Sequence, residues 1–122
     1  MDTMITDDEF HGYVVQAVDS LPAAYAQKLE NVTFIIQDLA DREICLRMKI
    51  PTPYALFGLY EGVPQPKRGL YQMVLPDRIT LYKIPHLLAS AGPRDLKNRI
   101  RATILHEVGH HFGLSEEELS GT

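Results

Sequence analysis

Two histidines and one glutamate, close together near the end of the printed sequence, have types and spacing suited to chemistry. His106-Glu107-Val108-Gly109-His110 is an HExxH sequence. On a helix, residues four apart lie on the same face, so the imidazoles of His106 and His110 can bind one tetrahedral zinc ion. Glu107 is turned by about 100° around the helix, where its carboxylate can reach a metal-bound water without binding the metal. The spacing predicts His106 and His110 as metal ligands.

The glutamate inside the motif is suited to act as a general base. Water bound to a catalytic zinc ion titrates near pH 7, compared with about 15.7 for bulk water. The carboxylate of Glu107 can accept the proton of such a water and pass it to a leaving amine. The metal would also polarise the scissile carbonyl. This combination predicts a single-zinc hydrolase that cleaves peptide bonds.

A catalytic zinc site also needs a third protein ligand and one open position. Glu116 is the leading candidate, because Gly113 is well placed to end the helix and let the chain turn back. The alternatives are Glu117 or a water in the third position. Glu116 could also belong to a solvated acidic tail together with Glu117 and Glu118. The alternative for the two motif histidines is a purely structural pair on a buried helix face.

The other histidines, the single cysteine and three tyrosines are expected to have ordinary structural roles. His111 projects about 100° away from His110 on the predicted helix, which favours packing or a surface position. Cys45 has no histidine or basic residue close by in the sequence, which favours a buried structural thiol. His11 and His86 are isolated in the sequence, which favours ordinary roles. An oxyanion donor could come from Tyr60, Tyr71 or Tyr82, but packing in the core or on the surface is expected for each.

The first third of the chain is expected to supply a helix and a strand. Apolar residues at helical spacing behind a capping-box sequence predict an amphipathic helix over residues 6–20. Pro22 interrupts this pattern, and residues 23–29 can extend it for two more turns. Residues 32–39 are short and rich in β-branched and aromatic side chains, which predicts a strand.

The middle of the chain contains one ambiguous segment and one irregular segment. Residues 42–50 alternate like a strand but also fit one face of a helix, and Asp41 as an N-cap favours the helix. Residues 51–69 are rich in proline and glycine, which predicts irregular, turn-rich chain. Two strands are expected next, over 70–75 and 78–83.

The motif itself falls on a predicted long helix. Residues 85–91 predict a short helix, and Pro93 suits the first turn of the helix that follows. Apolar residues recur along that helix at the spacing of one buried face. This stripe consists of Leu96, Ile100, Ile104, Leu105, Val108 and Phe112.

Composition and charge restrict the function classes. A chain of 122 residues with 45% hydrophobic and 23% charged residues suits one folded domain, residues 1–122. A formal net charge of −4 argues against nucleic-acid binding. One cysteine excludes an internal disulfide, and neither a signal peptide nor a membrane-spanning run is found. The expectation is a cytoplasmic protein without membrane or nucleic-acid partners. The densest basic stretch is expected to be a solvated helix face: Arg94, Lys97, Arg99 and Arg101.

Three stretches together resemble the bacterial minimal-zincin family. They are HEVGHHFGLSEEEL from His106 to Leu119, LFGLYEGVP over 56–64 and LPDRITLYK over 75–83. The resemblance implies an α+β fold, a minimal zincin-like arrangement of an N-terminal helix, a small mixed β-sheet and a C-terminal HExxH helix. The family pattern is HExxHxxGxxD, with an aspartate as the presumed third ligand. Here that position is Glu116, another carboxylate with one more methylene.

Three functions remain as hypotheses. The first is a Zn²⁺-dependent metallopeptidase acting on a peptide or unfolded protein in a shallow cleft, with the strand over 78–83 binding the substrate by β-augmentation. The second is a catalytically silent zincin-like protein that acts through partner binding. The third is a metal-dependent nuclease, against which the acidic charge and Glu107 both argue. The sequence leaves the oligomeric state open.

Overall fold

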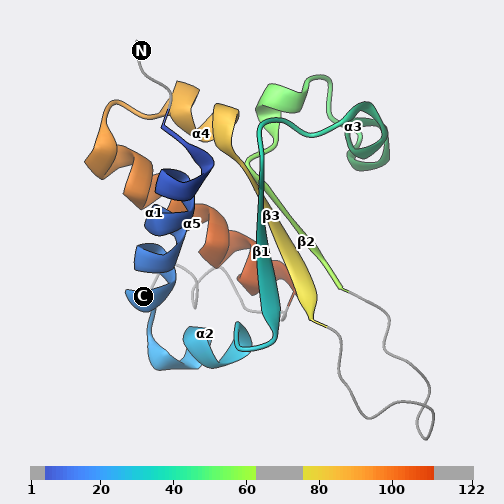
Figure 1. Cartoon of the computed structure of the whole chain (residues 1–122). Helices are drawn as coiled ribbons and strands as arrows, with labels where there is room; N and C mark the ends of the chain where they lie inside the picture. The colour runs from blue at the N-terminus through green and yellow to red at the C-terminus, as the bar shows by residue number, and fades with distance from the viewer. Residues whose placement is uncertain (1–4, 63–75, 112–122) are drawn as a thin grey trace, which may run out of the picture.

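The chain folds into a small three-stranded sheet with most of its helices packed on one face (Figure 1). The computed structural model describes residues 5–62 and 76–111. Among these residues, no helix is long and apolar enough to cross a membrane. The elements in chain order are α1 (Asp7–Asp19), α2 (Ala23–Lys28), β1 (Val32–Gln37), α3 (Arg42–Met48), η1 (Pro53–Ala55), β2 (Gly58–Glu61), β3 (Asp77–Tyr82), α4 (Lys83–Ala89) and α5 (Pro93–His111).

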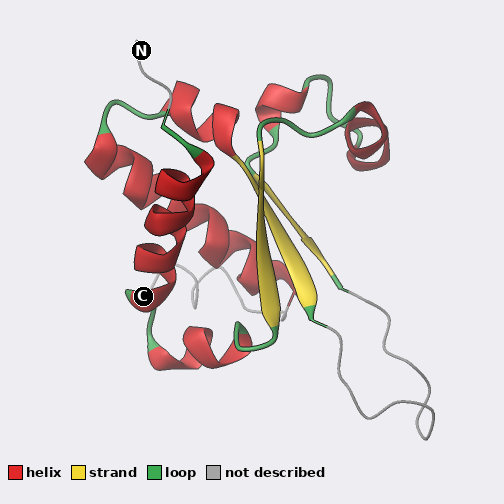
Figure 2. Cartoon of the chain, in the orientation of Figure 1, coloured by secondary structure: helices red, strands yellow, loops and turns green. Residues whose placement is uncertain are grey.

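The sheet has the order β1-β3-β2, so β3 is its central strand (Figure 2). β3 is parallel to β1, with Phe34 opposite Ile79, and antiparallel to β2, with Tyr60 opposite Ile79. The prediction that the strand over 78–83 offers a free edge to a substrate is therefore wrong, because β3 is hydrogen-bonded on both sides. The mixed α+β architecture is confirmed.

Strand β2 lies inside the segment that was expected to be irregular. Residues 51–69 are so rich in proline and glycine that the short strand among them, the four residues Gly58–Glu61, was not predicted. Hydrogen bonds to β3 stabilise this strand, and such long-range pairing leaves no local sequence pattern. The predicted strand over 70–75 lies outside the described residues.

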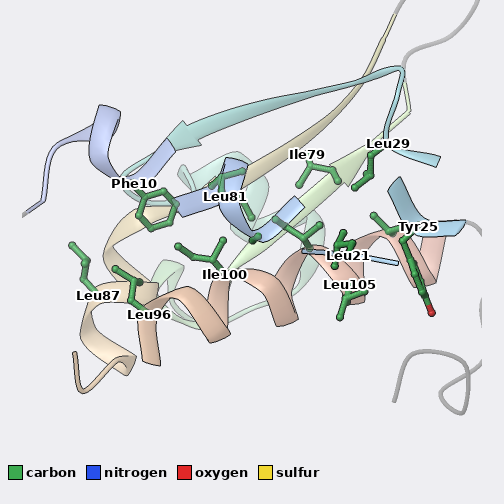
Figure 3. Close-up of a cluster of buried hydrophobic side chains, with 14 residues drawn as sticks. Phe10, Leu21, Tyr25, Leu29, Ile79, Leu81, Leu87, Leu96, Ile100 and Leu105 are labelled. Atoms are coloured by element: carbon green, nitrogen blue, oxygen red, sulfur yellow. The ribbon is translucent and has the colours of Figure 1, made fainter. Parts of the chain in front are cut away.

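The main core lies between the sheet and helices α1 and α5 (Figure 3). Ile79 and Leu81 of β3 point into it and are fully buried, as are Phe10 of α1 and Ile100 of α5. Alternate residues of β3 point to the opposite face, where Tyr82 joins a smaller buried cluster. The side chains of β3 thus alternate between the two faces of the sheet over residues 79–82.

Side-chain caps fix where two of the helices begin. The capping box predicted for α1 is present, with Thr6 Oγ1 accepting from the Glu9 amide at 3.1 Å and Glu9 Oε1 accepting from the Thr6 amide at 2.9 Å. For α3, Asp41 Oδ1 accepts from the Ile44 amide at 2.8 Å. Lys49 ends α3 in the left-handed conformation with φ 58°. The ambiguous segment over 42–50 is therefore a helix, as favoured.

Lys83 lies in a helix and not in the strand that was predicted for it. It was expected to end the strand over 78–83, but it begins α4 and has a side-chain exposure of only 9%. Its Nζ donates to Asp7 Oδ1 at 2.7 Å and to the Ile5 carbonyl at 3.2 Å. The hydrogen bond to Asp7 raises the pKa of Lys83, partly opposed by burial. Lys83 thereby connects the start of α1 to the start of α4.

We expect Lys83→Met to lower the free energy of unfolding by about 1–3 kcal/mol at neutral pH, because the half-buried Ile5 carbonyl and the Asp7 carboxylate both lose their donor. Since the folded-state pKa of Lys83 lies above its ordinary value of 10.5, the contribution is present below pH 10.5 and is lost as the pH rises through the folded-state value. Urea unfolding at several pH values measures this. Arg94→Met, at an exposed position of α5, is the control, and an equal loss in both variants would contradict the role of Lys83.

Candidate functional site

The two faces of α5 separate packing from chemistry. The apolar stripe predicted for this helix is buried at Leu96, Ile100, Ile104, Leu105 and Val108, none of which is more than 8% exposed. The sixth member of the stripe, Phe112, lies outside the described residues. By contrast, the first histidine of the motif is exposed and the glutamate beside it is half-buried. The motif therefore stands at the border between the packed and the open face of α5.

The carboxylate of Glu107 is held against the edge of the sheet. Its Oε1 accepts a hydrogen bond of 2.9 Å from the backbone amide of Tyr60 in β2. The Tyr82 amide donates to the Phe57 carbonyl at 3.0 Å, so the alternation of an antiparallel pair turns the backbone groups of Gly58 and Tyr60 away from β3. The predicted general base is thus bound to the outward-facing amide of β2, which is an edge strand among the described residues.

A close contact between β2 and α5 makes this hydrogen bond possible. A Cβ atom on Gly58 would come within 2.7 Å of Thr103 Cγ2 and 3.3 Å of the Thr80 carbonyl oxygen. The absence of a side chain at Gly58 lets the helix approach the strand at Thr103, one turn before Glu107. Gly58 is therefore a positioning residue for the site.

A buried histidine supports Thr103 from the other side. His86 is fully buried, with its ring edge-on to Phe10 at 5.6 Å and to Phe57 at 5.1 Å between centroids. Burial lowers its pKa, so the ring is neutral, and its Nδ1 donates to the Tyr82 carbonyl at 2.8 Å. Its Nε2 lies 2.8 Å from the Thr103 hydroxyl, whose oxygen also lies 3.0 Å from the Arg99 carbonyl. His86 thus has a structural role, as expected, and this role is to hold Thr103 in place.

A groove of about 300 Å³ runs between the edge strand and α5, with the motif at one end. The strand side is formed by residues 56–58. The helix side consists of Arg99, Ala102, Thr103, His106 and Glu107. The basic stretch of α5 was expected to be a solvated face, and Arg94, Lys97 and Arg99 are indeed exposed. Arg99, however, also lines the groove. The guanidinium of Arg99 therefore places a positive charge in the groove.

The three tyrosines that could supply an oxyanion donor were expected to pack instead, and the two that the structure describes do so. The hydroxyl of Tyr60 donates to Asp77 Oδ2 at 3.0 Å, and burial together with this carboxylate raises the pKa of Tyr60 to about 12. Tyr82 is buried in the smaller cluster on the far face of the sheet. Tyr71 lies outside the described residues.

Cys45, expected to be buried, is only half-buried against the smaller cluster on the far face of the sheet. The expected ordinary role of His11 fits its exposed position on α1.

The candidate zinc ligands are described only in part. His106 is exposed at the groove, whereas the side chains of His110 and His111, and all of Glu116, Glu117 and Glu118, lie outside the described part of the structure. Within residues 5–62 and 76–111, no group of three or more histidine, cysteine or acidic side chains lies close enough to hold a metal ion. The donor chemistry itself fits zinc, because α5 continues unbroken to His111 and so carries His106 and His110 one turn apart.

Comparison with known proteins identifies the family. A family model described as zincin-like metallopeptidase matches residues 29–122, which is more than half of the chain. This chain belongs to that family. A search of the curated proteins finds no match. Among solved structures, the chain is similar to a conserved hypothetical protein from Thermus thermophilus, with a TM-score of 0.55 and 20% identity, over 95% of this chain and 98% of the other. At that identity the similarity shows a shared fold.

Gly58→Ala should destabilise this zincin-like protein by about 1–3 kcal/mol, because the new methyl group overpacks the contact with the stiff Thr103 side chain. Thr103→Ser removes the clashing Cγ2 and keeps the hydroxyl, so the double variant should recover part of the loss. Gly12→Ala is the control, since nothing lies within 4 Å of the added methyl and the helix gains about 0.5–1 kcal/mol. Chemical denaturation measures all four proteins. Equal stability of Gly58→Ala and wild type would contradict the close approach.

Tyr60→Phe should cost about 1 kcal/mol at pH 7, because the Asp77 carboxylate loses its phenol donor. The raised pKa of Tyr60 stabilises the folded protein below pH 10, and this contribution is lost as the pH rises from 10 to about 12. The difference in the free energy of unfolding between the variant and the wild type should therefore become smaller between pH 10 and about 12. Unfolding measured at each pH, with the exposed Tyr54→Phe as control, tests this. A difference that stays constant to pH 12 would be evidence against it.

Proposed function

We propose that this chain is a single-zinc metallopeptidase in which Glu107 is the general base. The observation that supports this most directly is the position of Glu107. Its carboxylate lies beside the exposed His106, at the end of a groove, and is bound to the outward-facing amide of an edge strand. In this place it can accept a proton from a water above His106 while a substrate lies along the strand.

His106, His110 and Glu116 would hold the zinc ion. When bound, the ion would lower the pKa of a coordinated water and polarise the scissile carbonyl. Two neutral imidazoles and one carboxylate are a common ligand set for catalytic zinc. Glu116 is proposed from its spacing in the sequence, as the counterpart of the aspartate in the family pattern.

Strand β2 is the element on which we expect a substrate to bind. Within the described residues β2 is paired only with β3, and the backbone amide and carbonyl of Gly58 face its other edge, next to the Tyr60 amide that binds Glu107. An extended peptide can add to that edge as a further antiparallel strand, the commoner orientation in sheets. This replaces the expected substrate strand over 78–83. A groove of about 300 Å³ favours a short or unfolded peptide over a folded protein.

Binding of Glu107 by the Tyr60 amide has a chemical consequence. The hydrogen bond favours the ionised carboxylate, which is the form that accepts a proton. It also fixes one carboxylate oxygen. The amide therefore positions the base before a substrate arrives.

Glu107→Gln should keep bound zinc and lose peptide hydrolysis by at least about a hundredfold, because an amide cannot act as the base. The measurement combines elemental analysis of the purified, zinc-reconstituted protein with cleavage of a quenched fluorescent peptide library. His106→Ala is the matched variant and should lose both zinc and activity.

Two results would overturn the proposal. Hydrolysis at the wild-type rate by Glu107→Gln would exclude this residue as the base. A wild-type protein that binds no zinc after reconstitution near pH 7.5, or that cleaves no peptide when loaded, would favour the alternative of a catalytically silent zincin-like protein that binds a partner.

A further inference from the structure

Arg99 gives the groove a positive charge at a fixed distance from the motif. It lines the groove together with the motif residues, and its side chain is 45% exposed. It precedes His106 by seven residues, which is two helical turns or about 10 Å along the axis of α5. A ligand that reaches from the motif along the groove therefore meets a guanidinium group.

The guanidinium of Arg99 is oriented by its own helix and keeps donors for a ligand. Its Nε donates to Asp95 Oδ2 at 3.3 Å, and the same carboxylate oxygen accepts from the Ala91 amide at 2.9 Å. The Ala91 amide lowers the pKa of Asp95, which keeps this partner ionised. Because the contact to Asp95 uses Nε, the two terminal nitrogens can bind a carboxylate in the forked geometry that arginine favours.

The register of β2 against α5 determines which end of a substrate reaches Arg99. Gly58 lies against Thr103 and the Tyr60 amide against Glu107, so the strand and the helix run in the same direction. An antiparallel peptide on the edge of β2 runs in the opposite direction. Its residues after the cleaved bond therefore pass Thr103 and approach Arg99.

We propose that Arg99 is a specificity residue that selects peptides with a carboxylate two or three residues after the cleaved bond. An extended peptide advances about 3.3 Å per residue, so about 10 Å corresponds to three residues. This carboxylate is either an aspartate or glutamate side chain or the C-terminus of a short peptide. The inference rests on the proposed peptidase function and names the substrate class of the same site.

The test compares peptides that differ only at the second and third positions after the cleaved bond. Each peptide carries Asp, Asn or Ala there and is made as a free acid and as a C-terminal amide. With the zinc-loaded wild type, we expect kcat/KM to be about tenfold higher for carboxylate-bearing peptides than for their neutral analogues. The Asp/Asn pairs report a side-chain carboxylate, and the acid/amide pairs report the terminal one.

Arg99→Gln should abolish this preference, so that kcat/KM becomes the same for each carboxylate-bearing peptide and its neutral analogue. Arg99→Lys keeps the charge without the fork and should retain only part of the preference. Arg94→Gln, an exposed position on the same helix that does not line the groove, should retain it fully. Thermal melts confirm that all three variants are folded, as expected for exposed arginines.

The outcomes separate this inference from the proposed function. Hydrolysis without a preference for carboxylates, or a preference that Arg99→Gln keeps, overturns the inference and leaves the peptidase assignment in place. If no peptide is cleaved, the peptidase assignment fails, and binding of the fluorescein-labelled Asp and Asn peptides is compared instead. Tighter binding of the Asp peptide that is lost in Arg99→Gln supports the role of Arg99, whereas equal or undetectable binding overturns it.

Discussion

The hydrogen bond between the Tyr60 amide and the Glu107 carboxylate joins the two elements on which the site depends. It connects an edge strand to the motif helix across 47 residues of sequence. A half-buried carboxylate requires a partner, since an unsatisfied charge at that depth would be costly. The strand supplies this partner with a backbone group that β3 does not use. The same interaction therefore stabilises the fold and fixes the group that would act as base.

Much of the remaining structure serves to bring α5 to this strand. The core that α1, α5 and the sheet share sets the distance of the helix from the strands. Gly58 allows the approach at Thr103, and His86 holds Thr103 through its hydroxyl. A change at His86 or Gly58 would therefore be felt at Glu107 through packing, although neither residue has a part in the chemistry.

The sequence predicted those features that depend on local spacing. The HExxH motif, the apolar stripe of α5 and the capping box of α1 are regular patterns over a few turns, and the structure has helices at all three places. The N-cap at Asp41 correctly decided between helix and strand for the segment that follows it.

Features that depend on long-range pairing could not be predicted in this way. Strand β2 exists because β3 lies beside it, and no spacing rule relates Tyr60 to Glu107. The same applies to Lys83, whose partner at Asp7 is 76 residues away, and to the role of His86 beneath Thr103. The resemblance of the LYEGVP stretch to other family members was the one signal that this region matters, and it did not show how.

In the proposed function, α5 presents a zinc site in which Glu107 is positioned by the edge strand. Anomalous scattering at the zinc edge, from crystals grown with one equivalent of zinc, tests it most directly. The account predicts a single strong peak bound by His106 and His110, with Glu107 outside the first coordination shell and within hydrogen-bonding distance of a zinc-bound water. A peak at any other place, or Glu107 itself bound to the metal, would contradict it.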